Sequence, residues 1–228
     1  MTVSAPIFNQ DIFRFFRELA RNNNKPWMDE NRDRYQSAVV EPFRLLLDRL
    51  TPFALRLNPQ FVVSGRVGQN FSRINRDIRF AKDKSPYRPQ MYLFFAEPGE
   101  GGQLYVGLSA EAVTCGFRAY RQSRTSPLAT LSGERARTYS GYIDKQRRKF
   151  SRRFDSYWYA SEKGEWTKHR GWPSAPENWK KLQGWIVRKK VARSAATQAG
   201  FERQIAAIFR ELYPVYSFTT SRDWNSNR

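Results

Sequence analysis

The chain has 228 residues, of which 40% are hydrophobic and 15% aromatic, so it can bury one core or two small ones, and wholesale disorder is excluded. Its net charge of +19, from 40 Lys and Arg against 21 Asp and Glu, favours polyanionic partners such as nucleic acid, acidic lipid or phosphorylated ligands. One cysteine, Cys115, and one histidine, His169, exclude an intrachain disulfide and any metal site built from several such residues.

Localisation follows from the same features. No apolar run approaches the roughly 20 residues of a membrane span, and the first residues lack the basic start and apolar centre of a signal peptide. Cys115 lies in a strand-like run, where a buried, inert thiol is expected. We therefore expect a cytoplasmic protein with no membrane span, no cofactor and no metal.

The first quarter of the chain predicts helices. Residues 9–24 form an amphipathic pattern, with Asn9 as a candidate N-cap and an end in the asparagine run 22–24, where a left-handed residue is expected. Pro26 suits the first turn of a second helix, which Pro42 either kinks or restarts. The apolar stripes of these helices comprise Ile12, Phe15, Phe16, Leu19, Phe43, Leu46, Leu47 and Leu50.

The middle of the chain changes to a strand pattern. Residues 61–68 predict a strand, and residues 91–96, 103–110 and 112–120 predict a β-meander. The Pro- and Gly-containing segment 97–102 supplies the first turn of this meander.

The last third mixes both patterns. The sequence predicts a helix after Ser126-Pro127, a strand over 153–160, helices over 176–187 and 197–213, and a frayed tail over 220–228. The fold class that follows is α+β: a single domain over 1–228 with an N-terminal helical segment, a central antiparallel β-meander and C-terminal helices.

The densest chemistry lies in "FSRINRDIRFAKDKSPYRP", residues 71–89. Because Pro86 disfavours a helix at the preceding residue, an extended or turn conformation is expected from about Arg79 onward. Asp77 can hold an arginine in a bidentate pair, and the other cations then need water, a second acid such as Asp83 or an anionic ligand. The candidate anion-binding residues are Arg73, Arg76, Arg79, Lys84 and Tyr87, and Asp77 is also a candidate catalytic acid/base. The alternative is a purely structural network of ion pairs.

These residues resemble a known family. "RINRDIRFAKDKSPY" matches RxxRDxRFxxxKxPY, the signature of the family called domain of unknown function 2461, at every fixed position. The segment "FRFFRELARNNNKPWMDENRDRYQ" is similar to the N-terminal block of that family, including Asn22, Asn23, Lys25, Trp27 and Tyr35. Met28 stands where the family usually has an aromatic residue. The resemblance implies a single-domain α+β protein and implies no particular activity.

Between Lys145 and Arg193, tryptophans alternate with basic runs. Cations beside flat aromatic faces suit single-stranded nucleic acid, through phosphate neutralisation and base stacking. The alternative is that the tryptophans anchor the core and the cations form a solvated face. The candidate nucleic-acid contacts are Arg147, Arg148, Arg152, Arg153 and Trp179.

Three functions remain open at this point. The first is a binding module for phosphate-bearing partners, with RNA or DNA as the leading candidate. The second is an enzyme for a phosphorylated or nucleotide-like substrate, with Asp77 as acid/base and the motif arginines stabilising negative charge. The third is a structural subunit of a larger assembly. The oligomeric state is open in each case.

Overall fold

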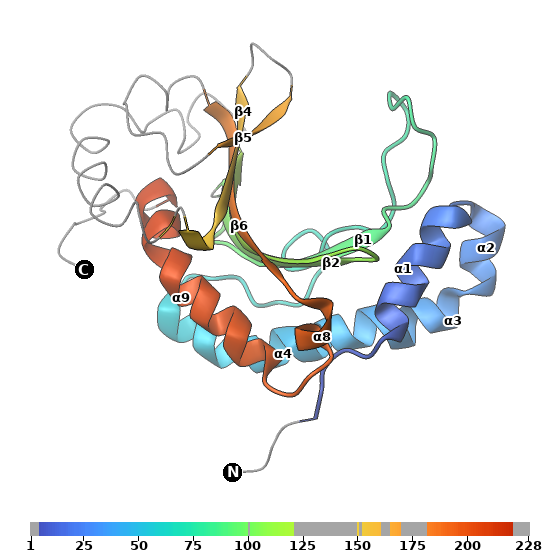
Figure 1. The fold of residues 1–228 in the computed structure, drawn as a ribbon, viewed down its shortest axis with the longest axis horizontal. Coiled ribbons are helices and arrows are strands. Elements are labelled where there is room, and N and C mark those ends of the chain that lie inside the picture. Colours follow the sequence, from blue (N-terminus) through green and yellow to red (C-terminus); the bar gives the residue numbers. More distant parts are fainter. Residues whose placement is uncertain are drawn as a thin grey trace. The chain divides into compact units, whose positions relative to one another are not determined.

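The fold consists of N-terminal helices, an antiparallel sheet and a C-terminal helix, which confirms the α+β class (Figure 1). A computed structural model describes residues 5–99, 101–120, 150, 152–160, 165–169 and 182–220. Its elements in chain order are α1 (Asp11–Arg21), α2 (Lys25–Glu30), α3 (Arg32–Tyr35), a π-helical turn (Gln36–Val40), α4 (Glu41–Leu57), β1 (Gln90–Phe95), β2 (Gly102–Ser109), β3 (Val113–Tyr120), β4 (Asp155–Ala160), β5 (Trp166–His169), β6 (Leu182–Val191), α8 (Arg193–Ala196) and α9 (Phe201–Thr220). The described strands follow the order β1-β2-β3-β6-β4-β5.

The chain forms two compact units that interleave along the sequence. The first comprises Met1–Phe95, Tyr105–Cys115 and Lys190–Ile208, and the second comprises Ala96–Leu104, Gly116–Lys189 and Phe209–Arg228. Helix α9 ends at residue 220, and the remainder of the expected frayed tail lies outside the described residues. The helix expected after Ser126-Pro127 also lies outside them.

The N-terminal helices confirm the predicted apolar stripes and correct two of the predicted ends. Asn9 accepts the Asp11 backbone N–H at 2.8 Å, one residue before the N-cap position, which Gln10 occupies. The chain leaves α1 at Asn22 with a φ of −121°, which is not left-handed. Asn24 instead caps α2 by accepting the Trp27 N–H at 3.0 Å, because its side chain replaces a missing helical carbonyl.

The next proline lies where the helix passes from a π-helical turn into α4, a position at which the sequence predicts either a kink or a restart. Pro42 lies in the first turn of α4, directly after the π-helical turn. Because proline has no N–H, the hydrogen-bond ladder must be rearranged where it enters, and a π turn is one way to do so. The buried stripe of α4 then comprises Phe43, Leu46, Leu47 and Leu50, together with Ala54.

The strand predicted over 61–68 is wrong, because this segment is an irregular loop. Gly65 and Gly68 have positive φ angles of 69° and 87°, which break an extended strand. Asn70, which is fully buried, replaces strand pairing: its Nδ2 donates to the carbonyls of Val62 at 2.7 Å and Phe94 at 3.1 Å, and its Oδ1 accepts from Gly65 N–H.

The helix predicted over 176–187 is also wrong for its described part, which belongs to strand β6. This strand lies between β3 and β4 and pairs antiparallel with β4, with Trp158 opposite Trp185. Gly116 of β3 permits the close approach of β6, since a Cβ there would lie 2.1 Å from the Val187 carbonyl oxygen. Pairing on both sides outweighs the local helical pattern.

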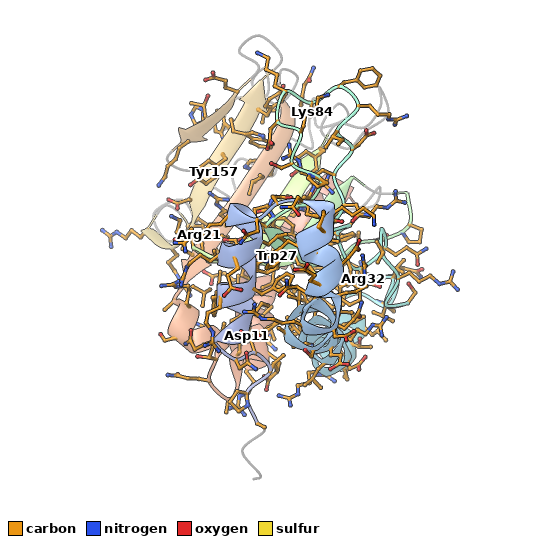
Figure 2. The ribbon with its side chains drawn as sticks, turned by 90° about the vertical axis from the view of Figure 1, so that its right-hand side faces the viewer. Asp11, Arg21, Trp27, Arg32, Lys84 and Tyr157 are labelled. Atoms are coloured by element: carbon orange, nitrogen blue, oxygen red, sulfur yellow. The ribbon has the colours of Figure 1, made fainter. Side chains whose placement is uncertain are left out.

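Each unit has its own aromatic core. In the first unit Phe8 contacts Phe43 edge-to-face at 5.3 Å, and α1 and α2 lie side by side with Phe15 against Trp27 (Figures 1 and 2). In the second unit the Phe117 ring contacts both Trp185 and Tyr216. The predicted face of α9, comprising Phe201, Ile205, Ile208 and Leu212, is buried, as is the Cys115 thiol.

Candidate functional site

Residues 71–89, which we call the motif loop, form a narrow projection that leads into β1 (Figure 1). Its base runs alongside that strand, where Ser72 N–H donates to the Tyr92 carbonyl at 3.0 Å. Its two arms are joined by Arg76 N–H to the Pro86 carbonyl and Arg88 N–H to the Ile74 carbonyl, both at 2.8 Å. This pairing holds the two arms extended and leaves residues 77–84 as the tip. From Arg79 onward the loop consists of bends and irregular backbone without a helix, in agreement with the expected extended or turn conformation.

Hydrogen bonds from the side chains of Arg88 and Asn23 hold the two arms of the loop in place. The Arg88 guanidinium donates to the carbonyls of Arg73 at 3.0 Å and Asn75 at 2.8 Å, across the two arms. From the end of α1, Asn23 donates to the Tyr87 carbonyl and accepts the Tyr87 N–H, each at 2.9 Å. Tyr87, one of the expected anion-binding residues, is buried at this junction.

Ion pairs shape the tip. Asp77 accepts from Arg79 at 3.0 and 2.7 Å in a bidentate pair, and both side chains are exposed. Arg76 pairs instead with Asp83, so Asp77 orients one arginine rather than the whole cluster. Lys84 donates to the Ile78 carbonyl at 3.0 Å and so closes the turn; Figure 2 labels it in the outer part of the loop.

These pairs also fix the ionisation of both acids. The Arg79 guanidinium beside Asp77 lowers the pKa of that carboxyl. Hydrogen bonds from Ser85 and from Arg76 hold the pKa of Asp83 well below its usual range. Both are carboxylates at neutral pH, so Asp77 is suited to orienting or accepting and poorly suited to donating a proton.

The motif loop retains a positive excess. Between Arg73 and Arg88 it carries six Lys and Arg against two Asp. Arg73 and Lys82 are exposed, and within the part of the chain that the structure describes neither side chain has a hydrogen-bond or ion-pair partner. These two cations are therefore free to meet an anion.

Phe80 is the residue that our site prediction omitted. Its side chain is 95% exposed at the tip of the loop, between Arg79 and Lys82. A fully exposed phenylalanine is unfavourable in water, and large exposed aromatics often mark contact sites. An aromatic residue inside a short polar loop, flanked by cations, is the sequence signal that could have identified it.

The predicted C-terminal contacts are only partly described. Arg147, Arg148 and Trp179 lie outside the described residues. Arg152 is exposed, whereas Arg153 pairs with Glu211 at 2.9 Å, so its charge is locally compensated.

The described tryptophans divide between packing and exposure. Trp185 is buried and donates to Ser156, and Trp158 stacks on His169 with ring centres 3.9 Å apart. Trp166 remains 39% exposed. It lines a hollow of about 420 Å³ in the second unit together with Tyr120, Tyr159 and Gln183.

Across the described ranges, no group of three or more His, Cys, Asp or Glu side chains is placed to hold a metal ion. Among the described helices, none combines the length and apolar character needed to cross a membrane.

Comparison with known proteins supports the resemblance seen in the motif. The model of the family described as "Conserved hypothetical protein (DUF2461)" matches residues 11–218. The chain belongs to this family. No curated protein and no solved structure matches the chain.

Proposed function

We propose that the protein is a binding module for phosphate-bearing polymers, with single-stranded RNA or DNA as its partner and the motif loop as its contact arm. The observation that carries this proposal is Phe80, almost fully exposed at the tip of a loop rich in cations. A base can stack on this ring while the neighbouring cations neutralise phosphates.

The hydrogen bonds of the motif loop separate the cations that maintain its shape from those that are available to contact phosphate. Arg76, Lys84 and Arg88 maintain the shape of the loop through Asp83 and backbone carbonyls. The side chains of Arg73 and Lys82, which have no hydrogen-bond or ion-pair partner among the described residues, supply phosphate contacts. Stacking on Phe80 adds about 1–3 kcal/mol per base, whatever the base. The net charge of +19 attracts the strand from a distance.

A second contact area lies in the second unit. The hollow lined by Tyr120, Tyr159 and Trp166 offers aromatic faces, and Arg152, an expected contact that is described and exposed, belongs to the same unit. We assign these residues a supporting role in holding the strand. A buried thiol at Cys115 suits a reducing compartment, and we propose the cytoplasm.

The test is fluorescence anisotropy with labelled oligouridylate over a salt series. Phe80→Ala should weaken binding by about fivefold or more with an unchanged log–log salt slope, because stacking carries no charge. Lys82→Gln should reduce the magnitude of that slope by about 0.7, the value for one phosphate contact on a single strand. Leu45→Ala, which truncates an exposed apolar side chain on α4, is the matched control and should change neither quantity.

Two results would count against the proposal. Equal affinities of the Phe80→Ala and Leu45→Ala variants, with heparin displacing the strand completely, would reduce the binding to general charge attraction. An oligonucleotide that fails to bind at low salt would favour a protein partner for Phe80 and therefore the structural-subunit alternative.

A further inference from the structure

The first unit contains a basic hollow that is separate from the motif loop. It has a volume of about 570 Å³ and is lined by Gln10, Phe13, Arg14 and Arg17 along α1 and by Arg193 and Ser194 at the start of α8. Hollows of this size accommodate small organic ligands. Three of its lining residues are arginines, so the chemistry of the hollow is that of an anion site.

The acids of α1 do not neutralise these arginines. Arg34 of α3 donates to both carboxylate oxygens of Asp11, at 3.0 and 2.8 Å, and forms an ion pair with Glu18 at 2.5 Å. Arg34 thereby lowers the pKa of Asp11, which stays ionised for that pair. Only a single contact of 3.4 Å joins Arg14 to Asp11, and Arg14 is largely exposed.

Arg17 has no such contact. It is exposed, and within the described part of the chain its side chain has no ion-pair or hydrogen-bond partner. Residues three apart on a helix are neighbours on its surface, so Arg14 and Arg17 present their guanidinium groups from adjacent turns. Figure 2 labels Asp11 and Arg21 near the two ends of this helix.

Arg193 is held in place on the other side of the hollow. It donates to the Ala110 carbonyl at 2.9 Å, and its guanidinium lies over the buried Phe13 ring, 5.7 Å from the ring centre. This hydrogen bond uses one of the five N–H donors of the Arg193 guanidinium. It orients the guanidinium and leaves the other donors available for a ligand. An oriented guanidinium loses less conformational entropy when it binds an anion.

We propose that this hollow binds a small phosphate-bearing molecule, of about the size of a mononucleotide, through Arg14, Arg17 and Arg193. Guanidinium groups match phosphate oxygens bidentately, and three of them balance a ligand carrying two or three negative charges. Gln10 and Ser194 offer hydrogen bonds to the polar remainder of the ligand. This site is distinct from the proposed strand-binding loop, and neither proposal depends on the other.

The test is isothermal titration calorimetry with inorganic pyrophosphate and then AMP at low ionic strength. Pyrophosphate should bind with one saturable site, and Arg17→Ala should weaken it about tenfold. Arg21→Ala is the matched control, because it removes the same charge from an exposed arginine one turn further along α1 and outside the hollow. It should change the affinity by about twofold or less, the effect of a distant screened charge.

Further measurements separate selective phosphate binding in the hollow from general attraction of anions to the protein. Citrate, which carries carboxylates, should bind more weakly than pyrophosphate if the hollow selects phosphate. Phe80→Ala should leave pyrophosphate binding unchanged, and Arg17→Ala and Arg21→Ala should have equal effects on oligouridylate binding. Equal losses of pyrophosphate affinity in Arg17→Ala and Arg21→Ala, several weak sites, or tighter binding of citrate would each overturn the assignment.

Discussion

The side-chain amide of Asn23 binds both backbone polar groups of Tyr87, with its Nδ2 on the carbonyl and its Oδ1 on the N–H, each at 2.9 Å. The two residues are 64 positions apart in the chain. One side chain thus acts as a strand partner for the second arm of the motif loop. This contact joins the two sequence blocks that carry the family resemblance.

Asn23→Ala should destabilise the protein by about 1–2 kcal/mol, because two hydrogen bonds to the loop backbone are lost. Asn23→Asp, which keeps the acceptor and loses the donor, should fall between wild type and alanine. The measurement is chemical denaturation, with Asn22→Ala as the control, because the Asn22 amide donates only to the exposed Glu18 carbonyl. If the alanine variants at 22 and 23 unfold at the same denaturant concentration, the contact does not hold the loop.

The buried Asn70 should matter more to stability than Asn23, because its side chain makes three hydrogen bonds to the backbone. Its replacement by alanine leaves the carbonyls of Val62 and Phe94 and the Gly65 N–H without their partner, at a cost of about 2–4 kcal/mol in unfolding free energy. Gln60→Ala, at an exposed position whose side chain makes no hydrogen bond among the described residues, should shift the unfolding free energy by about 0.5 kcal/mol or less. A small effect of Asn70→Ala would show that the 61–70 loop is held by other contacts.

The Asp11–Arg34 pair should make stability depend on pH in the acidic range. Because the folded pKa of Asp11 is lowered, the pair stabilises the fold fully above the ordinary aspartate pKa of about 4 and loses this contribution as pH falls through the folded value. Arg34→Met should lower stability by about 1 kcal/mol at neutral pH, since both side chains are partly exposed. Thermal unfolding near pH 7 and pH 3 is the measurement. The difference in melting temperature between wild type and Arg34→Met should be smaller at pH 3 than at pH 7, and an equal difference at both pH values would rule out the Asp11–Arg34 pair as its cause.

Asp77→Asn separates a fold-organising role from a surface role. Asp77 and Arg79 are both largely exposed, so the melting temperature should equal that of the wild type. Affinity for oligouridylate should rise, because the loop loses a negative charge and Arg79 is released. A lower melting temperature would restore Asp77 as an organiser of the cluster. Loss of binding at unchanged stability would mean that Asp77 aims Arg79 at the phosphate.

Local patterns were sufficient to predict the N-terminal helices, the apolar face of α9 and the meander. The stripes of α1, α4 and α9 arise from one buried face per helix, and periodicity reports such faces directly. Strands β1 to β3 are buried along most of their length, and their apolar runs between turn residues predict them. The strand predicted over 153–160 is confirmed as β4 for the same reason. Local turn chemistry also placed Pro26 and Pro42 correctly.

The failures have long-range causes. The 61–68 segment is shaped by Asn70, whose partners include Phe94, and β6 is decided by pairing with β3 and β4. The cluster of charges predicted where the candidate site lies, but it did not predict which residues pair. The turn at the tip brings Arg76 next to Asp83, and Asp77 therefore pairs with Arg79. The Arg34 bridge to Asp11 and Glu18 likewise has no local sequence signal.

The most direct test of the central claim is ultraviolet crosslinking of the protein to oligouridylate, with the crosslinked residues mapped by mass spectrometry. The account predicts a crosslink at Phe80, because the base is stacked on that ring, and its loss in Phe80→Ala while the melting temperature is unchanged. If crosslinks form only at residues outside 71–89 under conditions that saturate binding, the motif loop is not the contact arm and the proposed function is wrong.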